Sequence, residues 1–388
     1  MMKDLAIPGH NEIKTVIARL IDQGRLPHAI LIHERSGGAG LALANFTVRR
    51  LLCAQPNGIT PCGECGACQK TNQYVHPDVN YIYPVNLNKS VKKTDDRHSA
   101  SFFEQWREMN LSNPVPGLLS WYKAIDIERK QGFIGDEESK ELRKKLALRS
   151  YEGGFRVFVI WHAERMNHSF ANKMLKQFEE PTEKTVFILV SDNPAAMLPT
   201  VISRVQVFRE ASFSDEEMIE FLVNSFDIDR QKASEIAFRC EGNLQQAIIE
   251  ARGDESPWFP VFQNWMRLSY KRDLAGLYSW SLDMSKHSRD EQKAFCDFAL
   301  QNLDKSFRLN WLPENLPPQG EAVKFYRDFS KFINAANVGG FQELIEEIAV
   351  HIERNVYEKL VWFDASIKSI RLIHAGKALV KQMTDQAS

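Results

Sequence analysis

Residues 149–210 read RSYEGGFRVFVIWHAERMNHSFANKMLKQFEEPTEKTVFILVSDNPAAMLPTVISRVQVFRE. Two short apolar runs, at 155–161 and 185–190, lie on either side of an amphipathic helical pattern that ends in Glu-Glu-Pro. Runs of five or six apolar β-forming residues around a helix are typical of buried parallel strands joined by a crossover helix. The stretch therefore predicts an α/β fold built on a parallel sheet.

A third apolar run, at 205–208, comes directly after Ser203 and Arg204. Ligands of an open α/β sheet usually bind at the edge where its parallel strands end. We therefore interpret Arg204 as a candidate for nucleotide chemistry, either at a site of this chain or at a site of a neighbouring chain. The alternative is an intramolecular salt bridge at the edge of the sheet.

The composition narrows the class of protein. At 388 residues the chain is long enough for two or three domains, and 44% apolar with 26% charged residues is ordinary for a globular protein. The net charge of −1 gives no global attraction to nucleic acid, so any DNA contact has to come from a local patch or from partners. We find neither an apolar run of the roughly 18–20 residues that span a bilayer nor a signal peptide, and expect a cytoplasmic protein.

The first expected strand, at 28–33, precedes a glycine-rich turn at 34–40 and an expected helix at 41–52. This succession of strand, turn and helix is the context that a phosphate-binding loop requires. It predicts a loop with the shape of a phosphate site. An unrelated glycine turn is the alternative.

The residues that would bind nucleotide are missing from this loop. A working loop has a Lys that reaches the phosphates and a Ser or Thr for Mg²⁺, where this chain has Gly40 and Leu41. The position that opens the loop holds Glu34, whose carboxylate would repel phosphate. We therefore expect a degenerate loop, with no nucleotide bound at Gly37, Gly38, Gly40 and Leu41.

Four of the six cysteines fall within sixteen residues, as Cys53, Cys62, Cys65 and Cys68. Four thiolates with two CxxC steps match a structural tetrahedral zinc site, in which no coordination position is left open for catalysis. The alternative is a chance cluster of free buried thiols. The remaining two are expected to be core residues: Cys240 and Cys296.

The segment 86–135 interrupts the alternation of strands and helices, after an expected strand at 76–82. Its aromatic residues, among them Trp106 and Trp121, suggest two readings. One is a surface that stacks on DNA bases, and the other is an insertion of loops and short helices that packs its own aromatic rings. We favour the second reading.

An ATPase would carry acidic residues at the end of the strand at 155–160, for Mg²⁺ and for polarising water. This chain has Trp161 and His162 there, which do not coordinate Mg²⁺ as carboxylates do. Glu164 comes one turn later, and we expect it to cap a helix or form a salt bridge. A second part of an ATP site is therefore missing.

Beyond Phe208 the pattern becomes helical. Ser214 with Glu217 is typical of a helix start, three short helices are expected up to about residue 252, and prolines mark a boundary near 257. The rest resembles an all-α oligomerisation or scaffold bundle. We expect three domains: an α/β domain at 1–209, a helical lid domain at 210–255 and a helical collar domain at 256–388.

Taken in order, these motifs resemble the bacterial clamp-loader branch of the AAA+ family, which has a P-loop NTPase-like α/β domain with a parallel five-stranded sheet. The resemblance is closer to its delta-prime branch than to the related gamma/tau branch, and it spans roughly residues 10 to 250. Besides the four-cysteine knuckle, the motifs that carry it are His28-Ala29-x-Leu31, His76-Pro77-Asp78-Val79, Ala163-Glu164-Arg165-Met166, Asn172-x-x-Leu175-Lys176-x-x-Glu179-Glu180-Pro181, Ser203-Arg204 and Gly242-Asn243-Leu244.

The positions at which this chain differs from the family's ATP-site motifs distinguish the two branches. Gamma/tau subunits have an intact phosphate loop, Mg²⁺ carboxylates and a sensor arginine, whose place is taken here by Gln245-Gln246. The resemblance thus implies a delta-prime stator that binds no ATP in its own site. Val205 replaces the cysteine of the family's Ser-Arg-Cys motif, which weakens the match but keeps the charge of Arg204.

The resemblance also implies a mechanism. Five subunits form an open ring below a collar, and each ATP lies between the loop of one subunit and the arginine of the next. Arg204, with Ser203, would be an arginine finger for a neighbour's ATP. The implied partners are gamma/tau and delta subunits, the sliding clamp and primer-template DNA, at the nucleoid. The implied cofactor is structural zinc, and no intrinsic catalysis is expected.

Two other functions fit parts of the sequence. One is an ATP-hydrolysing subunit of the gamma/tau type with a divergent site. The other is a zinc-stabilised nucleic-acid-binding protein with no role in clamp loading, which the net charge of −1 does not favour.

Overall fold

The computed structural model describes residues 9–253, 257–311 and 321–387. By its contacts the chain divides into two compact units. Unit 1 holds the chain up to Ser225 together with Gly242–Ile248, and unit 2 holds Phe226–Glu241 and the chain from Ile249 onward. The division into three domains with borders near 209 and 255 stays a prediction.

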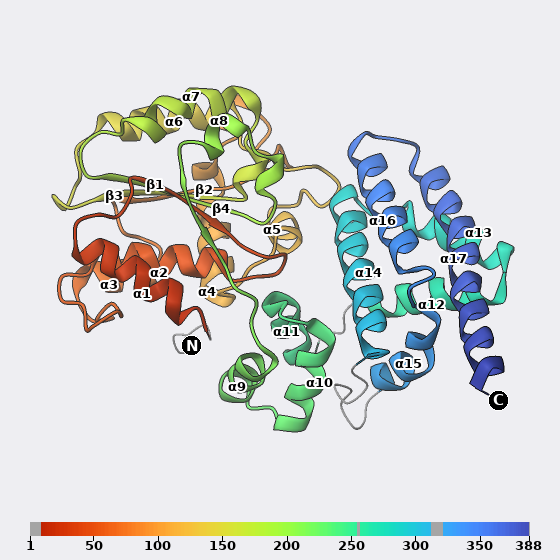
Figure 1. The fold of residues 1–388 in the computed structure, drawn as a ribbon. Helices are drawn as coiled ribbons and strands as arrows, with labels where there is room; N and C mark the ends of the chain where they lie inside the picture. Colours follow the sequence, from red (N-terminus) through yellow and green to blue (C-terminus); the bar gives the residue numbers. More distant parts are fainter. Residues whose placement is uncertain (1–8, 254–256, 312–320, 388) are drawn as a thin grey trace. The chain divides into compact units, whose positions relative to one another are not determined.

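Unit 1 is built on a sheet of five parallel strands in the order β2-β3-β4-β1-β5 (Figure 1). The expected five-stranded parallel sheet is therefore confirmed. Its strands are β1 Ala29–His33, β2 Val79–Ile82, β3 Arg156–Trp161, β4 Thr185–Ser191 and β5 Gln206–Arg209. Every residue of β3 and β4 is buried, as the continuous apolar runs require when helices cover both faces of a sheet.

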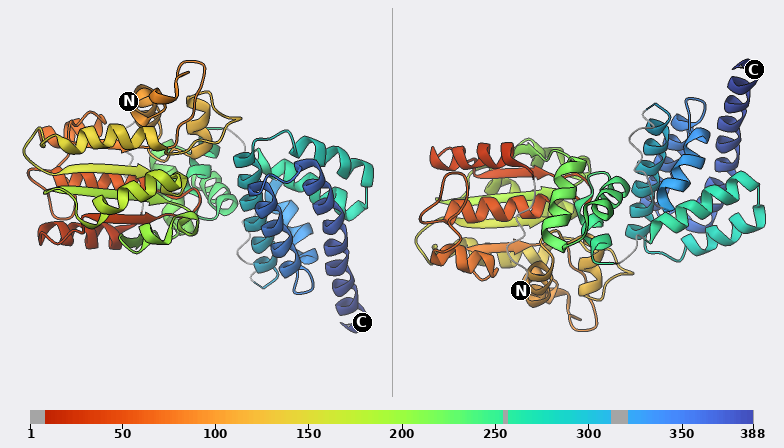
Figure 2. Two further views of the ribbon diagram at one scale, coloured as in Figure 1. Left: turned by 90° about the horizontal axis from the view of Figure 1, so that it is seen from above. Right: turned by 90° about the horizontal axis from the view of Figure 1, so that it is seen from below.

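Helices cover the two faces of this sheet. Apolar residues of α1, α2, α4 and α5 form one core with one face, and those of α6, α7 and α8 form a second core with the other. In the view from below in Figure 2, α1, α2 and α3 (red to orange) lie in front of the strands. The helices are α1 Asn11–Asp22, α2 Gly40–Leu52, α3 Gly66–Asn72, α4 Phe103–Ser112, α5 Leu118–Ala124, α6 Asp136–Ala147, α7 His168–Glu179 and α8 Pro199–Ile202.

The inserted segment at 86–135 packs its aromatic rings inward. Trp106 and Trp121 are fully buried. Trp106 packs edge-on against Trp121, with ring centroids 5.4 Å apart, and also contacts Tyr83 and, in β3, Trp161. The expected packing of the insertion on its own rings is confirmed, and these rings do not form a DNA-stacking surface.

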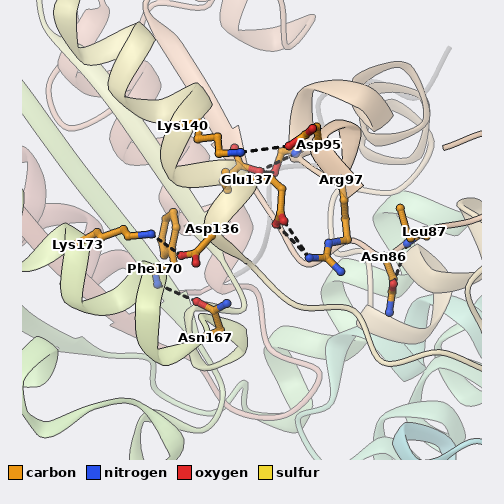
Figure 3. Close-up of polar contacts among 12 residues, drawn as sticks. Asn86, Leu87, Asp95, Arg97, Asp136, Glu137, Lys140, Asn167, Phe170 and Lys173 are labelled. Carbon is orange, nitrogen blue, oxygen red and sulfur yellow. Dashed lines mark hydrogen bonds and ion pairs between the residues drawn. The ribbon is translucent and has the colours of Figure 1, made fainter. Parts of the chain in front are cut away.

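Ion pairs attach the insertion to α6 (Figure 3). Arg97 donates hydrogen bonds to both carboxylate oxygens of Glu137 at 3.1 Å, and Lys140 lies 3.1 Å from Asp95. Asp136, at the start of α6, pairs with Lys173 of α7 at 2.7 Å. The insertion thus forms part of unit 1 and is fixed to a helix that covers the sheet.

Three helices follow the sheet, as expected: α9 Asp215–Phe226, α10 Arg230–Cys240 and α11 Leu244–Ala251. The predicted start of α9 is confirmed, because the Ser214 backbone N–H donates to Glu217 at 2.9 Å and the Glu217 N–H donates to the Ser214 hydroxyl at 3.3 Å. Short turns of 3₁₀ helix in the described residues include η1 Thr94–Asp96, η2 Ser99–Phe102, η3 Ala163–Arg165, η4 Pro194–Ala196 and η6 Ser330–Phe332.

The described part of unit 2 contains helices and no strand. Its core is rich in aromatic residues: Trp265 stacks on Trp280 with centroids 5.2 Å apart, and Trp362 packs edge-on against Phe295. Its remaining helices are α12 Trp258–Lys271, α13 Leu274–Met284, α14 Arg289–Leu309, α15 Glu321–Phe329, α16 Val338–Glu353 and α17 Glu358–Ala387.

The helical pattern expected over 341–362 is divided between α16 and α17. The chain turns at Asn355, whose φ of 60° lies in the left-handed region that asparagine tolerates better than most residues. Among the described helices, we find none with the length and apolarity needed to cross a lipid bilayer.

Candidate functional site

The candidate site lies at the edge where the parallel strands end. Glu34 follows β1, His162 follows β3, Asp192 follows β4 and Glu210 follows β5. Because β3, β4, β1 and β5 are neighbours in the sheet, their carboxyl ends bring these four side chains together around the glycine-rich loop. This is the usual ligand-binding edge of a parallel sheet.

The amide groups of the loop are occupied by side chains of the chain itself. The N–H of Gly40 donates to Glu34 Oε2 at 2.7 Å, and the N–H of Ala39 donates to Glu210 Oε1 at 2.7 Å. The N–H of Arg35 reaches the other oxygen of Glu210 at 3.2 Å. Amides at a helix N-terminus are the groups that bind phosphate in a working loop. Two carboxyl groups occupy these positions instead.

The loop glycines allow this close approach. A Cβ added at Gly40 would lie 2.5 Å from Glu34 Oε2, and one added at Gly38 would lie 2.1 Å from Glu210 Oε2. Any larger residue at either position would push the carboxyl group out of the loop. The glycines expected from a phosphate-loop shape are therefore present, but they accommodate carboxylates.

Burial changes the ionisation of the acidic side chains at this edge of the sheet. Both Glu34 and Glu210 are more than nine-tenths buried. Loss of hydration, together with the nearby carboxylate of Glu210, raises the pKa of Glu34 to about 8. Glu34 is thus mainly protonated at neutral pH, because burial and the neighbouring carboxylate of Glu210 already disfavour its ionised form.

His162 and Glu164 form a buried ion pair. Burial disfavours a charged imidazole, but the Glu164 carboxylate, 2.7 Å from Nδ1, outweighs it and raises the pKa of His162 to about 9. The salt bridge expected for Glu164 is confirmed. Ligand atoms of His162, Glu164 and Asp192 lie within 4.8 Å of one another, the spacing of a metal site. A metal ion would have to displace the proton that joins His162 to Glu164.

Helix α11 also contacts the loop. The N–H of Gln245 donates to the carbonyl oxygen of Gly37 at 3.1 Å, and the Asn243 side chain lies so close to Gly37 that a Cβ there would be 2.1 Å from its oxygen. Gln245, which belongs to the predicted Gln245-Gln246 position, is thus placed beside the glycine-rich loop.

Sequence reasoning missed Glu210. The only signal was an acidic residue two positions beyond the third apolar run, directly after a strand that the structure places next to β1. His10 was missed as well, and its Nε2 lies 3.2 Å from Glu210 Oε1.

Arg204 lies at the opposite end of β5, between α8 and the strand. Its Nε donates to Glu179 Oε1 at 2.6 Å, and its Nη1 donates to the carbonyl of Thr200 at 2.9 Å and to the Ser203 hydroxyl at 3.3 Å. The guanidinium is partly exposed and Ser203 is exposed. The salt bridge that was the alternative reading of Arg204 therefore exists.

A shallow apolar hollow of about 470 Å³ adjoins Ser203. Its lining, mostly from η4 and α8, consists of Pro194, Ala195, Met197, Pro199, Ile202 and Ser203. The exposed hydroxyl and the guanidinium next to it are thus bordered by apolar surface.

The four clustered cysteines come together at the start of α3. Their sulfur atoms lie within 4.8 Å of one another, and those of Cys62 and Cys68 are 3.9 Å apart. Zn–S bonds of about 2.3 Å in a tetrahedron place sulfurs roughly 3.8 Å apart. The arrangement fits a structural zinc ion held by Cys53, Cys62, Cys65 and Cys68.

Backbone N–H groups favour the thiolate form of Cys62 and Cys65, whereas burial raises the pKa of Cys68. The N–H of Cys65 donates to Cys62 Sγ at 3.4 Å, and hydrogen bonds from the backbone lower the pKa of Cys62. Although burial opposes ionisation, backbone groups of Ala54 and Cys68 lower the pKa of Cys65 to about 6. Thiolate is the form that binds metal. The other two cysteines are buried singly, as expected: Cys240 and Cys296.

Comparison with known proteins identifies relatives. A family model described as "DNA polymerase III, delta subunit" matches residues 9–213. DNA polymerase III subunit delta' of Haemophilus influenzae is 25% identical over 253 residues, which are 63% of this chain and 64% of the relative. Its counterpart in Yersinia pestis is 30% identical over 181 residues, 47% of this chain and 41% of the relative. The chain thus matches less than two thirds of the length of these relatives.

Weaker similarities are found to proteins named for the gamma subunit of DNA polymerase III. DNA polymerase III subunit gamma of Buchnera aphidicola is 23% identical over 62% of this chain and 56% of the relative. Among solved structures, a DNA polymerase III gamma subunit-related protein of Thermotoga maritima covers 93% of this chain and 99% of its own, at 12% identity and a TM-score of 0.37.

Proposed function

The chain belongs to the DNA polymerase III, delta subunit family, and we propose that it is a delta-prime-like stator subunit of the clamp loader that places the sliding clamp on primed DNA during replication. In this role it neither binds nor hydrolyses ATP in its own loop. It contributes Arg204 to the ATP site of a neighbouring ATPase subunit.

One observation carries the stator role. The amides of the glycine-rich loop that would bind phosphate are taken by Glu34 and Glu210 at 2.7 Å. For ATP to bind, both carboxyl groups would have to leave, and a polyanion would replace them beside buried acidic side chains, where Coulomb repulsion is only weakly screened. The loop also has no lysine to balance that charge.

The surroundings of Arg204 support a role in trans. Partly exposed ion pairs contribute only about 0–1 kcal/mol, so exchange of Glu179 for a phosphate oxygen on a neighbouring subunit costs little. The contact with Ser203 holds the guanidinium at the surface. An arginine finger that stabilises charge on a transferred phosphoryl group is worth roughly 10³–10⁵ in rate in other NTPases.

The apolar hollow beside Ser203 supports contact with another protein. A neighbouring ATPase subunit that covers its proline, methionine and isoleucine side chains would bring its ATP toward Arg204. We propose gamma/tau and delta subunits as the neighbours, and the clamp and primer-template DNA as partners of the assembled complex. Structural zinc at Cys53, Cys62, Cys65 and Cys68 would stabilise the segment between α2 and α3.

Two measurements test this proposal. Isothermal titration of the purified chain with Mg-ATP is expected to give no binding in the micromolar range, and micromolar affinity would establish the gamma/tau-type alternative instead. Mixing the chain with an ATP-competent gamma/tau subunit and a delta subunit is expected to give one complex on size exclusion. Separate elution of all components would contradict the stator role.

A further inference from the structure

Unit 2 contains a cavity of about 390 Å³ that the proposed stator function does not use. It lies between α12, α15, η6 and the middle of α17. Its floor is apolar and consists of Met266, Phe325, Phe329 and Ile373, all of them buried. Ligand sites in proteins span roughly 300–1,000 Å³, so this cavity is at the small end and suits one or two large side chains.

The rim of this cavity is basic. Arg267, Lys271 and Lys324 line it against a single carboxylate, Asp328. All four side chains are exposed, and in the part of the chain that the structure describes none of the three cations forms an ion pair. The whole chain has a net charge of −1, so an excess of unpaired cations here is a local feature and does not follow from the composition.

Two aromatic rings extend the rim. Tyr270 and Phe332 lie with ring centroids 5.2 Å apart. The Lys377 ammonium lies 4.5 Å from the Tyr270 ring centroid, and the Lys331 ammonium lies 5.3 Å from that of Phe332. These ammonium groups add further positive charge at the mouth. They also cover one face of each ring, which disfavours the stacking of nucleic acid bases on the pair.

We propose that this rim and cavity bind an acidic peptide segment of a partner protein. A large apolar side chain of that segment, aromatic or branched aliphatic, enters the cavity above Met266 and Phe329. Its flanking carboxylates face Arg267, Lys271 and Lys324. Complementarity favours this occupant. An apolar hollow accommodates an apolar side chain, and the unpaired cations around it attract carboxylates on either side of that side chain.

Such a site would tether a partner through unit 2, independently of Arg204 and of the degenerate loop in unit 1. Contacts between a short peptide and an exposed basic rim bind with modest affinity and weaken as salt screens the charges. Binding in the micromolar range that decreases with ionic strength is therefore the expected behaviour.

Fluorescence anisotropy with the full chain tests the proposal. The probes are three fluorescein-labelled hexapeptides with four acidic residues followed by Leu-Phe, Ile-Leu or Trp-Phe. A peptide with Ser-Ser at the apolar end, a peptide with Lys in place of the acidic residues, and a labelled oligo-dT strand are compared with them. We expect at least one acidic-apolar probe to bind, and at least tenfold weaker binding of the first two comparison peptides.

Variants locate the binding to this cavity. Arg267→Glu and Lys324→Glu are each expected to weaken the probe about tenfold, because reversal of a rim charge replaces an attraction by a repulsion. Lys359→Glu, an exposed and unpaired position near the start of α17, is the matched control and is expected to change nothing. Far-ultraviolet circular dichroism and thermal melting of each variant establish that the fold is kept.

The results separate the outcomes. The proposal would be overturned if none of the three acidic-apolar probes bound at protein concentrations 100-fold above the micromolar range. It would also be overturned if Arg267→Glu and Lys324→Glu left the binding of the probes unchanged. Binding of oligo-dT that these two variants abolish, with no binding of the probes, would assign the rim to nucleic acid instead.

Discussion

Oε1 of Glu210 accepts a hydrogen bond from the backbone N–H of Ala39 at 2.7 Å, across 171 residues of sequence. This contact joins the end of β5 to the loop after β1. It places a carboxylate where a phosphate would bind, and it makes Glu210 part of the loop's own structure. The stability and the activity of the protein are expected to depend on this hydrogen bond and on the contacts of Arg204, His162 and the cysteine cluster.

Glu210→Ala is expected to destabilise the chain by about 1–3 kcal/mol, because it leaves the buried amide of Ala39 and the partly buried amide of Arg35 without their acceptor. Urea unfolding followed by circular dichroism measures this loss. Glu220→Ala, at an exposed position of α9, is the control and is expected to stay within about 0.5 kcal/mol of the parent. Equal stability of the two variants would show that the loop does not depend on Glu210.

Arg204→Ala is expected to leave this subunit folded and to lower hydrolysis at the ATP site it serves by roughly 10³-fold, with a corresponding loss of clamp loading. The measurements are ATPase and clamp-loading assays of the reconstituted complex. Arg209→Ala, which removes an exposed arginine at the last position of β5, is the matched control. Rates unchanged by Arg204→Ala would rule out the finger role.

Glu179→Ala distinguishes a finger from a structural salt bridge. It removes the same ion pair as Arg204→Ala but keeps the guanidinium. If Arg204 acts on a neighbour's phosphate, Glu179→Ala retains ATPase activity and clamp loading, and its stability changes by no more than about 1 kcal/mol. If the two variants lose activity equally, the ion pair itself is what matters.

Stability is expected to fall as the pH rises from about 6 to 9. Two buried groups have folded-state pKa values above their ordinary ones, Glu34 at about 8 and His162 at about 9. A group of this kind binds its proton more tightly in the folded state, so its contribution is complete below the unfolded pKa and is lost as the pH passes the folded pKa. Urea unfolding at intervals between pH 6 and 9.5 measures the decline.

Glu34→Gln is the variant that tests this assignment. The amide cannot ionise, so the part of the decline that comes from Glu34 disappears and the curve between pH 6 and 8 becomes flatter. The part from His162, which faces Glu164, Asp192 and Glu34, remains up to about pH 9. A decline identical to that of the parent chain would show that Glu34 does not hold a proton in the folded state.

Elemental analysis of the purified chain is expected to find about one zinc ion per chain. Cys65→Ser should lose most of this zinc and melt at a lower temperature, because a hydroxyl replaces one thiolate of the tetrahedron. Cys296→Ala removes a cysteine of the unit 2 core and should keep the zinc. Zinc content that does not depend on Cys65 would place the metal elsewhere.

The sequence by itself determined the elements of unit 1 and the parts that its loop lacks. The apolar runs at 155–161 and 185–190 predicted β3 and β4, and the spacing of Cys62, Cys65 and Cys68 predicted a metal knuckle. These are short-range patterns: side chains of a buried strand or a CxxC step are placed by the few covalent bonds between them. The absence of a lysine at Gly40 is likewise visible in the letters alone.

The tertiary structure decided which groups fill the loop, and where unpaired charge gathers. Glu210 reaches Ala39 only because β5 pairs with β1, and Arg204 meets Glu179 only because α7 and α8 pack on the same face of the sheet. The basic cavity of unit 2 likewise combines α12, α15 and α17, which are far apart in the chain. Such contacts depend on the order of strands and on helix packing, which the periodicity of a single segment does not specify.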